Sequence, residues 1–155
     1  VEFHILGPYY PGNPTAITQE EMQRWDEKGI VHYLGTTDDV RSVITAYDCV
    51  VLTSYIEGLS RVLLEAASMS KPIITTNVPG CKEVVDDGVN GYLCKVKDSD
   101  SLAEQMENLI LLSDEERMQM GREGRAKVIK EFDEKIVIEK YKEAISVILY
   151  PKGIS

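Results

Sequence analysis

The chain has 155 residues, a length typical of one domain that buries about two-thirds of its unfolded surface. Its formal net charge of −9 argues against nucleic acid and against an anionic lipid surface as partners of this chain. None of its apolar runs approaches the roughly 20 residues needed to cross a bilayer. The three cysteines are odd in number and widely spaced, which disfavours a disulfide framework and fits a reducing, cytoplasmic setting.

The ends of the sequence and its histidines add two expectations. The first residue is not Met, and residues 1–6 already have the character of a strand, so we expect a further part of the protein upstream. The histidines, His4 and His32, stand alone in strand-like runs and lack the spacing of metal ligands. We therefore expect neither a metal ion nor another cofactor.

Short apolar runs bounded by turn residues predict strands at residues 1–6, 30–34, 49–52, 73–75 and 92–94. Helical spacing predicts helices at residues 18–29, 40–47, 60–69, 101–112, 114–130 and 134–149. The first helix has the clearest start, because Thr18 and Glu21 form a capping box. The last helix is apolar nearly all round, which is typical of a core helix or of a helix with a second apolar partner.

The alternation of strands and helices predicts the fold class. The strands are apolar without strict alternation, which favours an α/β protein with a Rossmann-like parallel sheet covered by helices on both faces. Such folds bind ligands beyond the carboxyl ends of their strands. Residues 35–37, 55–60 and 77–80 follow predicted strands and should lie at those ends.

The rest of the chain is organised around residues 52–67, where a buried strand passes through a turn into a helix. Ser60 is in the position of a helix N-cap, and apolar side chains follow at helical spacing. These apolar positions are Val62, Leu63, Ala66 and Met69. Unpaired N–H groups and the helix dipole at such a helix start favour an anion, so we predict that a diphosphate binds there.

Two carboxylates, Glu57 and Glu65, frame this turn with seven residues between them. An ionised carboxylate can accept two hydrogen bonds from the vicinal hydroxyls of a ribose or a hexose. The spacing is equally compatible with a surface role in which Glu65 pairs with Arg61 one turn earlier. The spacing alone leaves both interpretations open.

Three motifs together carry a family resemblance. They are the run Glu57-Gly58-Leu59 with Glu65-Ala66, the run Lys71-Pro72-Ile73-Ile74-Thr75-Thr76, and Pro79-Gly80-Cys81-x-Glu83-Val84-Val85 followed by Gly88 and Gly91. The chain resembles, over nearly its whole length, the retaining glycosyltransferases of the GT-B fold that carry the E-x7-E motif. It is similar in particular to bacterial enzymes of lipid-linked glycan and polysaccharide synthesis.

This resemblance implies a function for the whole protein. Residues 1–155 would be the C-terminal, nucleotide-sugar-binding half of a GT-B fold, and the acceptor-binding N-terminal domain would lie outside this chain. The protein would transfer a sugar with retention from a nucleoside-diphosphate sugar, a UDP-sugar by resemblance, to an acceptor hydroxyl. It would work in the cytoplasm, at the inner face of the membrane if its acceptor is lipid-linked, and it would need no metal.

The resemblance also implies roles for residues of the turn. Glu57 matches the glutamate that touches donor-sugar hydroxyls near the reacting centre, and Glu65 matches the one that holds the ribose. The backbone amides of Gly58, Leu59 and Ser60 match those that meet the distal phosphate and the sugar.

The segment Gly35-Thr36-Thr37 matches the part of the family that lines the nucleobase, largely through its main chain. Ile56 departs from the family, which often has a basic residue there. An Arg and a Lys that neutralise the diphosphate in the family precede the strand with which this chain begins. We therefore expect the isolated chain to bind nucleotide weakly and to show no transferase turnover.

Two other functions remain open at this point. A nucleotide-sugar epimerase of related two-domain fold would bind the same ligands but would not require the glutamate pair. A non-catalytic interaction module could keep the fold and lose the reaction. The epimerase would form an epimer instead of transferring a sugar, and the module would retain its partner when Glu65 is replaced.

Overall fold

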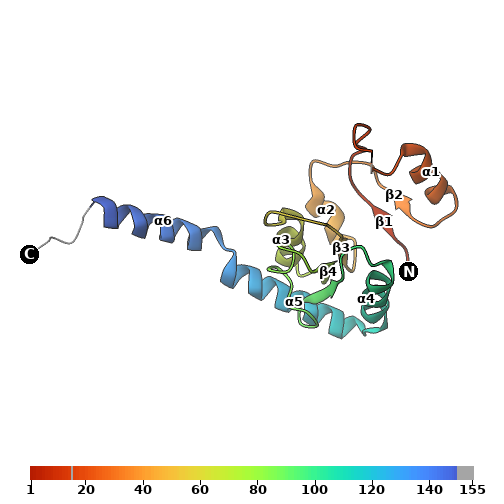
Figure 1. Ribbon diagram of the computed structural model, residues 1–155. Coiled ribbons are helices and arrows are strands. Elements are labelled where there is room, and N and C mark those ends of the chain that lie inside the picture. Colours follow the sequence, from red (N-terminus) through yellow and green to blue (C-terminus); the bar gives the residue numbers. More distant parts are fainter. Residues whose placement is uncertain (15, 150–155) are drawn as a thin grey trace, which may run out of the picture. The chain divides into compact units, whose positions relative to one another are not determined.

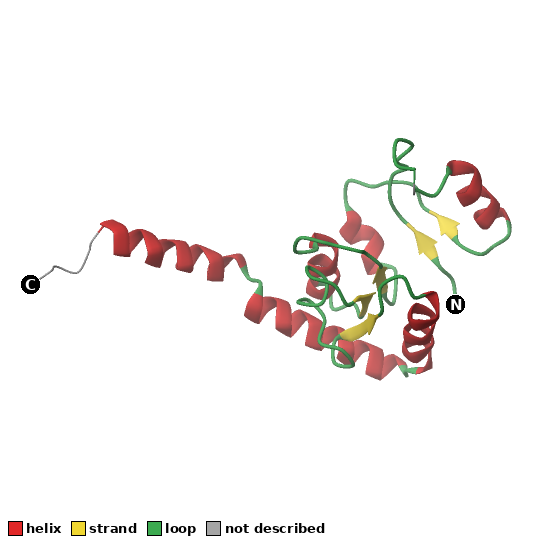
Figure 2. Ribbon diagram, viewed as in Figure 1, coloured by secondary structure: helices red, strands yellow, loops and turns green. Residues whose placement is uncertain are grey.

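The computed structural model describes residues 1–14 and 16–149 of the chain (Figure 1). It divides into two compact units, Val1–Val40 and Arg41–Ser155. Strands and helices alternate along the sequence up to residue 76, and the described chain ends in consecutive helices after its last strand; Figure 2 distinguishes the two kinds of element by colour. The predicted α/β class is therefore confirmed.

The first unit contains two short parallel strands and one helix. Strand β1 (His4–Ile5) pairs with β2 (His32–Tyr33), and helix α1 (Gln19–Glu27) lies between them in sequence. The predicted capping box is present, because the Thr18 side chain accepts from the Glu21 N–H and the Glu21 side chain reaches back to the Thr18 backbone. Gly29, with a φ of +66°, follows the end of this helix as predicted.

These two strands are shorter than the runs that predicted them. Backbone hydrogen bonds continue beyond β1 and β2, from the Leu34 N–H to the Ile5 carbonyl and from the Gly7 N–H to the Gly35 carbonyl, both at 2.9 Å. Val1 is 86% exposed, so the apolar start of the chain contributes little burial to the first strand. An apolar run predicts where a strand lies, but burial and pairing set its length.

The second unit is built on a three-stranded parallel sheet. Strand β4 (Ile73–Thr76) lies in the middle, between β3 (Val50–Leu52) and β5 (Gly91–Cys94). The helices in chain order are α2 (Val40–Thr45), which begins at the boundary of the two units, α3 (Arg61–Ser68), α4 (Ser99–Leu111), α5 (Asp114–Glu131) and α6 (Glu134–Leu149).

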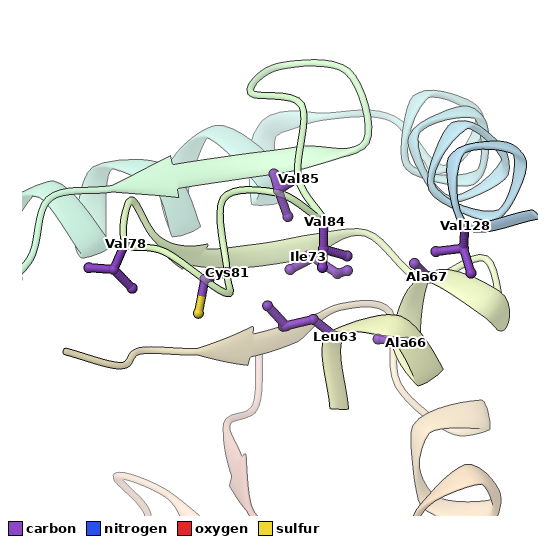
Figure 3. Close-up of a cluster of buried hydrophobic side chains, with 9 residues drawn as sticks. All are labelled: Leu63, Ala66, Ala67, Ile73, Val78, Cys81, Val84, Val85 and Val128. Atoms are coloured by element: carbon purple, nitrogen blue, oxygen red, sulfur yellow. The ribbon is translucent and has the colours of Figure 1, made fainter. Parts of the chain in front are cut away.

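Adjacent residues of β4 face opposite sides of this sheet, as the pleat of a strand requires. Ile73 belongs to a core cluster with Leu63 of α3 and Val128 of α5, drawn in Figure 3. Ile74 belongs to a second cluster, which contains Leu109 of α4 and Met120 of α5. Helices therefore cover both faces of this sheet, which confirms the predicted layering.

The last helix differs from the others. Among the residues of α6 that the structure describes, none is buried, and most of its large apolar side chains are exposed. The alternative of a simple core helix does not fit that exposure. In the described ranges 1–14 and 16–149, none of the helices has both the length and the apolarity needed to span a bilayer.

Two glycines of helix α5 lie close to the end of α3, and they differ in the space that a side chain would have. A Cβ added at Gly121 would lie 1.9 Å from the Ser70 carbonyl oxygen, whereas one added at Gly124 would meet only ordinary contacts at 3.6 Å. The first glycine permits the close approach of two backbone segments. The second has room for a methyl group.

Replacing these glycines separately should therefore have opposite effects on stability. We expect Gly121→Ala to destabilise the protein by about 1–3 kcal/mol, because the backbone at Ser70 must shift. The matched variant Gly124→Ala should be neutral or stabilise by up to ~1 kcal/mol, since alanine favours the helix. Urea unfolding monitored by circular dichroism measures both, and equal effects would contradict this account of α5 packing.

Candidate functional site

The candidate site lies where β3 and β4 end. Leu52 and Thr75 are partners in the parallel register, so the turns that follow these strands start at the same edge of the sheet. The Thr75 hydroxyl donates to the Leu52 carbonyl at 2.7 Å. The Thr76 hydroxyl donates to the Ser54 carbonyl at 2.6 Å and accepts from the Ser54 N–H at 3.0 Å. Side chains of β4 thus fix the first residues after β3.

Gly80 brings the second turn against the first. Its φ of +87° is in the left-handed region, and a Cβ there would lie 1.6 Å from the Gly58 carbonyl oxygen. Two backbone hydrogen bonds cross the same contact, from the Glu57 N–H to the Pro79 carbonyl at 3.4 Å and from the Ser60 N–H to the Gly80 carbonyl at 3.1 Å. Glycine at this position allows the backbones of the two turns to touch.

The start of α3 provides the predicted donors for an anion. Within the described residues, the N–H groups of Gly58 and Leu59 have no hydrogen-bond acceptor, and the first-turn N–H groups of α3 are likewise open. The Ser60 N–H differs, because the Gly80 carbonyl already accepts from it. Two of the three predicted backbone donors are therefore available to a ligand.

Ser60 is at the N-cap, but it does not cap in the predicted way. Its backbone is extended and its residue is 5% exposed, yet its side chain makes no capping hydrogen bond within the described chain. The residue is instead fixed through its backbone, because its N–H donates to the Gly80 carbonyl where the two turns meet. The sequence correctly predicts that Ser60 lies at the N-cap. It does not predict the hydrogen bond of the Ser60 N–H, which depends on the distant segment at Gly80.

The buried face of α3 is rotated by one position from the predicted one. Leu63 and Ala66 are fully buried as predicted, and Ala67 is buried with them. Val62 is 38% exposed, so its prediction as a core residue was wrong. Two small alanines let α3 lie close to α5, which explains why the larger valine is left outside the contact.

Glu57 is held by its own turn. The Ser54 hydroxyl donates to Glu57 Oε1 at 3.0 Å, and the side chain is half-buried. This hydrogen bond fixes the carboxylate between the end of β3 and the start of α3. The other carboxylate oxygen remains available as an acceptor for a hydroxyl group.

Glu65 lies one turn into α3 and is half-buried. The alternative in which it pairs with Arg61 is not observed, since the described residues include no ion pair between these two side chains. Leaving a half-buried carboxylate without a cation or a donor costs free energy. Such a side chain is suited to accept hydrogen bonds from a ligand.

The third predicted segment belongs to the first unit. Gly35 has a φ of +73°, and its carbonyl accepts from the Gly7 N–H. Thr36 is exposed, while the Thr37 hydroxyl accepts from the Asp39 N–H at 3.1 Å and so caps the local turn. The side chain of Thr37 is therefore partly committed to its own loop, which leaves the main chain of Gly35 and Thr36 as the accessible part.

Two residues of the candidate site escaped the sequence analysis. Thr76 fixes Ser54, and the Lys97 ammonium lies 5.2 Å from the centre of the Tyr55 ring. The position of Thr76 at the end of a buried strand was a usable signal, because a buried hydroxyl must find a partner. Lys97 lies 42 positions after Tyr55 and gave no such signal.

The thiols take no part in this site. Burial raises the pKa of the Cys49 thiol to about 12, so this group is not a thiolate at neutral pH. Cys81 and Cys94 are buried as well.

Parallel strands, covering helices and an open helix N-terminus at the strand ends define a Rossmann-like α/β domain. Residues 4–127 match the family described as Glycosyl transferases group 1, and the chain belongs to this family. The predicted family is therefore confirmed.

Relatives of known name and structure agree with this assignment. The chain is 37% identical over 112 residues to N-acetyl-alpha-D-glucosaminyl L-malate synthase of Bacillus anthracis, a match that covers 72% of this chain and 29% of the relative. It is 30% identical over 129 residues to the N,N'-diacetylbacillosaminyl-diphospho-undecaprenol alpha-1,3-N-acetylgalactosaminyltransferase of Campylobacter jejuni, covering 83% of this chain and 33% of the relative. The chain thus spans about a third of the length of these curated relatives.

A solved structure resembles this fold closely. The crystal structure of Anabaena Alr3699/HepE in complex with UDP superposes with a TM-score of 0.82 at 25% sequence identity. The match covers 94% of this chain and 41% of that one. The described fold is therefore shared with a protein that was solved in complex with UDP.

The Thr76 hydroxyl makes a stability test of the site's frame possible. We expect Thr76→Val to lower the free energy of unfolding by about 1–3 kcal/mol, because Ser54 loses a donor and an acceptor in a part-buried position. The exposed Thr53→Val variant removes a hydroxyl from the same turn and should change stability by less than ~0.5 kcal/mol. Equal denaturation midpoints for the two variants would refute this role of Thr76.

Proposed function

We propose that this chain is the donor-binding domain of a glycosyltransferase that uses a nucleoside-diphosphate sugar. The observation that carries the proposal is that two features occur together. Glu65 is half-buried and has no ionic partner among the described residues, and the start of its helix has open N–H groups. The helix start suits a diphosphate, and the carboxylate suits the vicinal hydroxyls of a ribose. Both groups belong to one turn and its helix.

The donor is a UDP-sugar in this proposal. The UDP complex of the Anabaena relative supports the choice of nucleotide. Glu65 accepts from the ribose hydroxyls, and the amides of Gly58 and Leu59 bind the distal phosphate. Ser60 contributes by holding the turn, because its own N–H is engaged with Gly80.

The reaction transfers the sugar to an acceptor hydroxyl with retention of the anomeric configuration. As the bond from the sugar to the diphosphate breaks, negative charge grows on the leaving phosphate, and the open amides at the start of α3 stabilise it without reorganisation. Glu57, oriented by the Ser54 hydroxyl, accepts from hydroxyls of the donor sugar and positions it. No metal ion takes part in this scheme.

The acceptor belongs to lipid-linked glycan or cell-surface polysaccharide synthesis, a choice supported by the undecaprenol-linked acceptor in the name of the Campylobacter relative. The protein then works in the cytoplasm at the inner face of the membrane. Residues outside this chain supply the acceptor site, since the relatives are about three times as long.

Calorimetric titration of the whole protein with UDP, GDP and ADP tests the donor site. We expect UDP to bind most tightly and Glu65→Ala to weaken UDP binding by about 1–3 kcal/mol, roughly 5- to 150-fold, because the ribose loses a charge-assisted acceptor. Glu104→Ala removes the same charge from an exposed position on α4 and serves as the control. Unchanged UDP affinity in the Glu65 variant would rule out the ribose contact.

A second assay decides the reaction. The whole protein, supplied with a UDP-sugar and an acceptor extract, should form a glycosylated product that keeps the donor's anomeric configuration. Formation of an epimer of the donor without transfer would assign the site to an epimerase. Nucleotide binding without either product would indicate a module that has kept only the fold.

A further inference from the structure

The tip of the turn after β3 is weakly held. Tyr55 is 71% exposed and Ile56 is 81% exposed, so neither side chain is fixed by burial. The hydrogen bonds that anchor the turn lie on either side of this tip, at Ser54 through Thr76 and at Glu57 through Pro79. Between those anchors, the Ser54 hydroxyl donates to the Ile56 carbonyl at 3.3 Å and to Glu57 Oε1 at 3.0 Å, and the contact that reaches the tip from a distant segment is the Lys97 ammonium over the Tyr55 ring.

Lys97 reaches Tyr55 from the loop between β5 and α4. Its backbone has a φ of +58°, a conformation that residues other than glycine rarely adopt. The loop is anchored on both sides, because the Lys95 N–H donates to the Ser101 hydroxyl at 3.0 Å and Asp98 caps α4 by accepting from the Ser101 N–H at 2.8 Å. A strained lysine is thus held in place by its neighbours.

The ammonium of Lys97 has no carboxylate partner within the described residues. The adjacent Asp98 is committed to the helix cap, and the ion pairs of the described chain involve other lysines and arginines. The ammonium is 5.2 Å from the centre of the Tyr55 ring, within the range of a cation–π interaction. The side chain therefore acts on the turn that precedes Glu57.

We propose that Lys97 is a positioning residue of the donor site: by holding Tyr55, it fixes the turn that presents Glu57 and the Gly58 and Leu59 amides. The inference rests on the proposed function for its effect on the donor, but the ordering of the turn can be measured without any donor. A lysine that binds Tyr55 limits the conformations of residues 54–58 before the nucleotide arrives. The binding step then loses less conformational freedom.

The variant Lys97→Gly separates this role from general stability. Glycine accepts the left-handed φ, so we expect the melting temperature to stay the same or to rise. Hydrogen–deuterium exchange of residues 54–59 without nucleotide should nevertheless be faster in the variant. The KM for the UDP-sugar should rise about two- to fivefold, the range expected from loss of an exposed cation–π contact, while kcat changes less.

Three further variants make the test specific. Lys97→Arg keeps the cation over the ring and should preserve both the exchange rate and KM. Lys95→Ala removes an exposed charge from the same loop and should change neither quantity. In a double-mutant cycle, Lys97→Gly should have little further effect once Tyr55 is replaced by leucine.

The outcomes distinguish this proposal from the proposed function. Unchanged exchange of residues 54–59 in Lys97→Gly overturns the positioning role, as does an equal effect of that variant with and without Tyr55. If the unaltered protein binds no UDP and residues 54–59 still exchange faster in Lys97→Gly, the role of Lys97 in ordering the turn is supported and the donor-binding function is overturned. A lower melting temperature in Lys97→Gly, with loss of binding in proportion, would show a structural role only and overturn the proposal.

Discussion

The structure of the candidate site depends on the contact between Gly80 and the backbone of residues 57 and 58. A side chain at Gly80 would overlap the Gly58 carbonyl, and its φ of +87° suits glycine. The hydrogen bonds that Glu57 and Ser60 make to Pro79 and Gly80 require the same close approach. The Gly80 carbonyl, which this contact provides as an acceptor, accepts from the Ser60 N–H. The neighbouring N–H groups of Gly58 and Leu59 are left without an acceptor among the described residues. One backbone contact thus decides which donors remain for a ligand.

This contact is held in place by the parallel sheet. The register of β3 and β4 brings Leu52 beside Thr75. The hydroxyls of Thr75 and Thr76 donate to the carbonyls of Leu52 and Ser54, which continues the contact between the two segments beyond the strands. On one face, Leu63 of α3 is fully buried in the cluster around Ile73 (Figure 3). The helix that carries Glu65 is therefore fixed to the same sheet as the turn that carries Glu57. Loops place the polar groups of the site, but rigid elements set the distances among them.

The sequence predicts what depends on neighbours along the chain and misses what depends on distant ones. The Thr18 capping box, the strands around Val51 and Ile74 and the helix α3 between them follow from local patterns, and the structure has them. The exposure of Val62 could not be predicted, because one step along a helix turns the side chain by about 100° and the helix α5 selects the buried face. The Lys97 contact joins segments that share no local pattern. Family motifs located the glutamates, but the hydrogen bonds between Ser54 and Thr76, which hold the turn before Glu57, join segments that are distant in the sequence.

The charge of the chain constrains how such a site can bind a diphosphate. A net charge of −9 repels a polyanion at long range, but salt limits that repulsion to about 8 Å at physiological ionic strength. Affinity must therefore come from groups within a few ångströms of the phosphates. Backbone amides meet this need well, because they attract an anion and do not have to be paired with acids when the site is empty. Glu65, a carboxylate near the same helix start, adds repulsion toward phosphate that hydrogen bonds to a ligand hydroxyl must offset. Its presence thus favours a ligand that carries hydroxyls beside its phosphates over inorganic diphosphate.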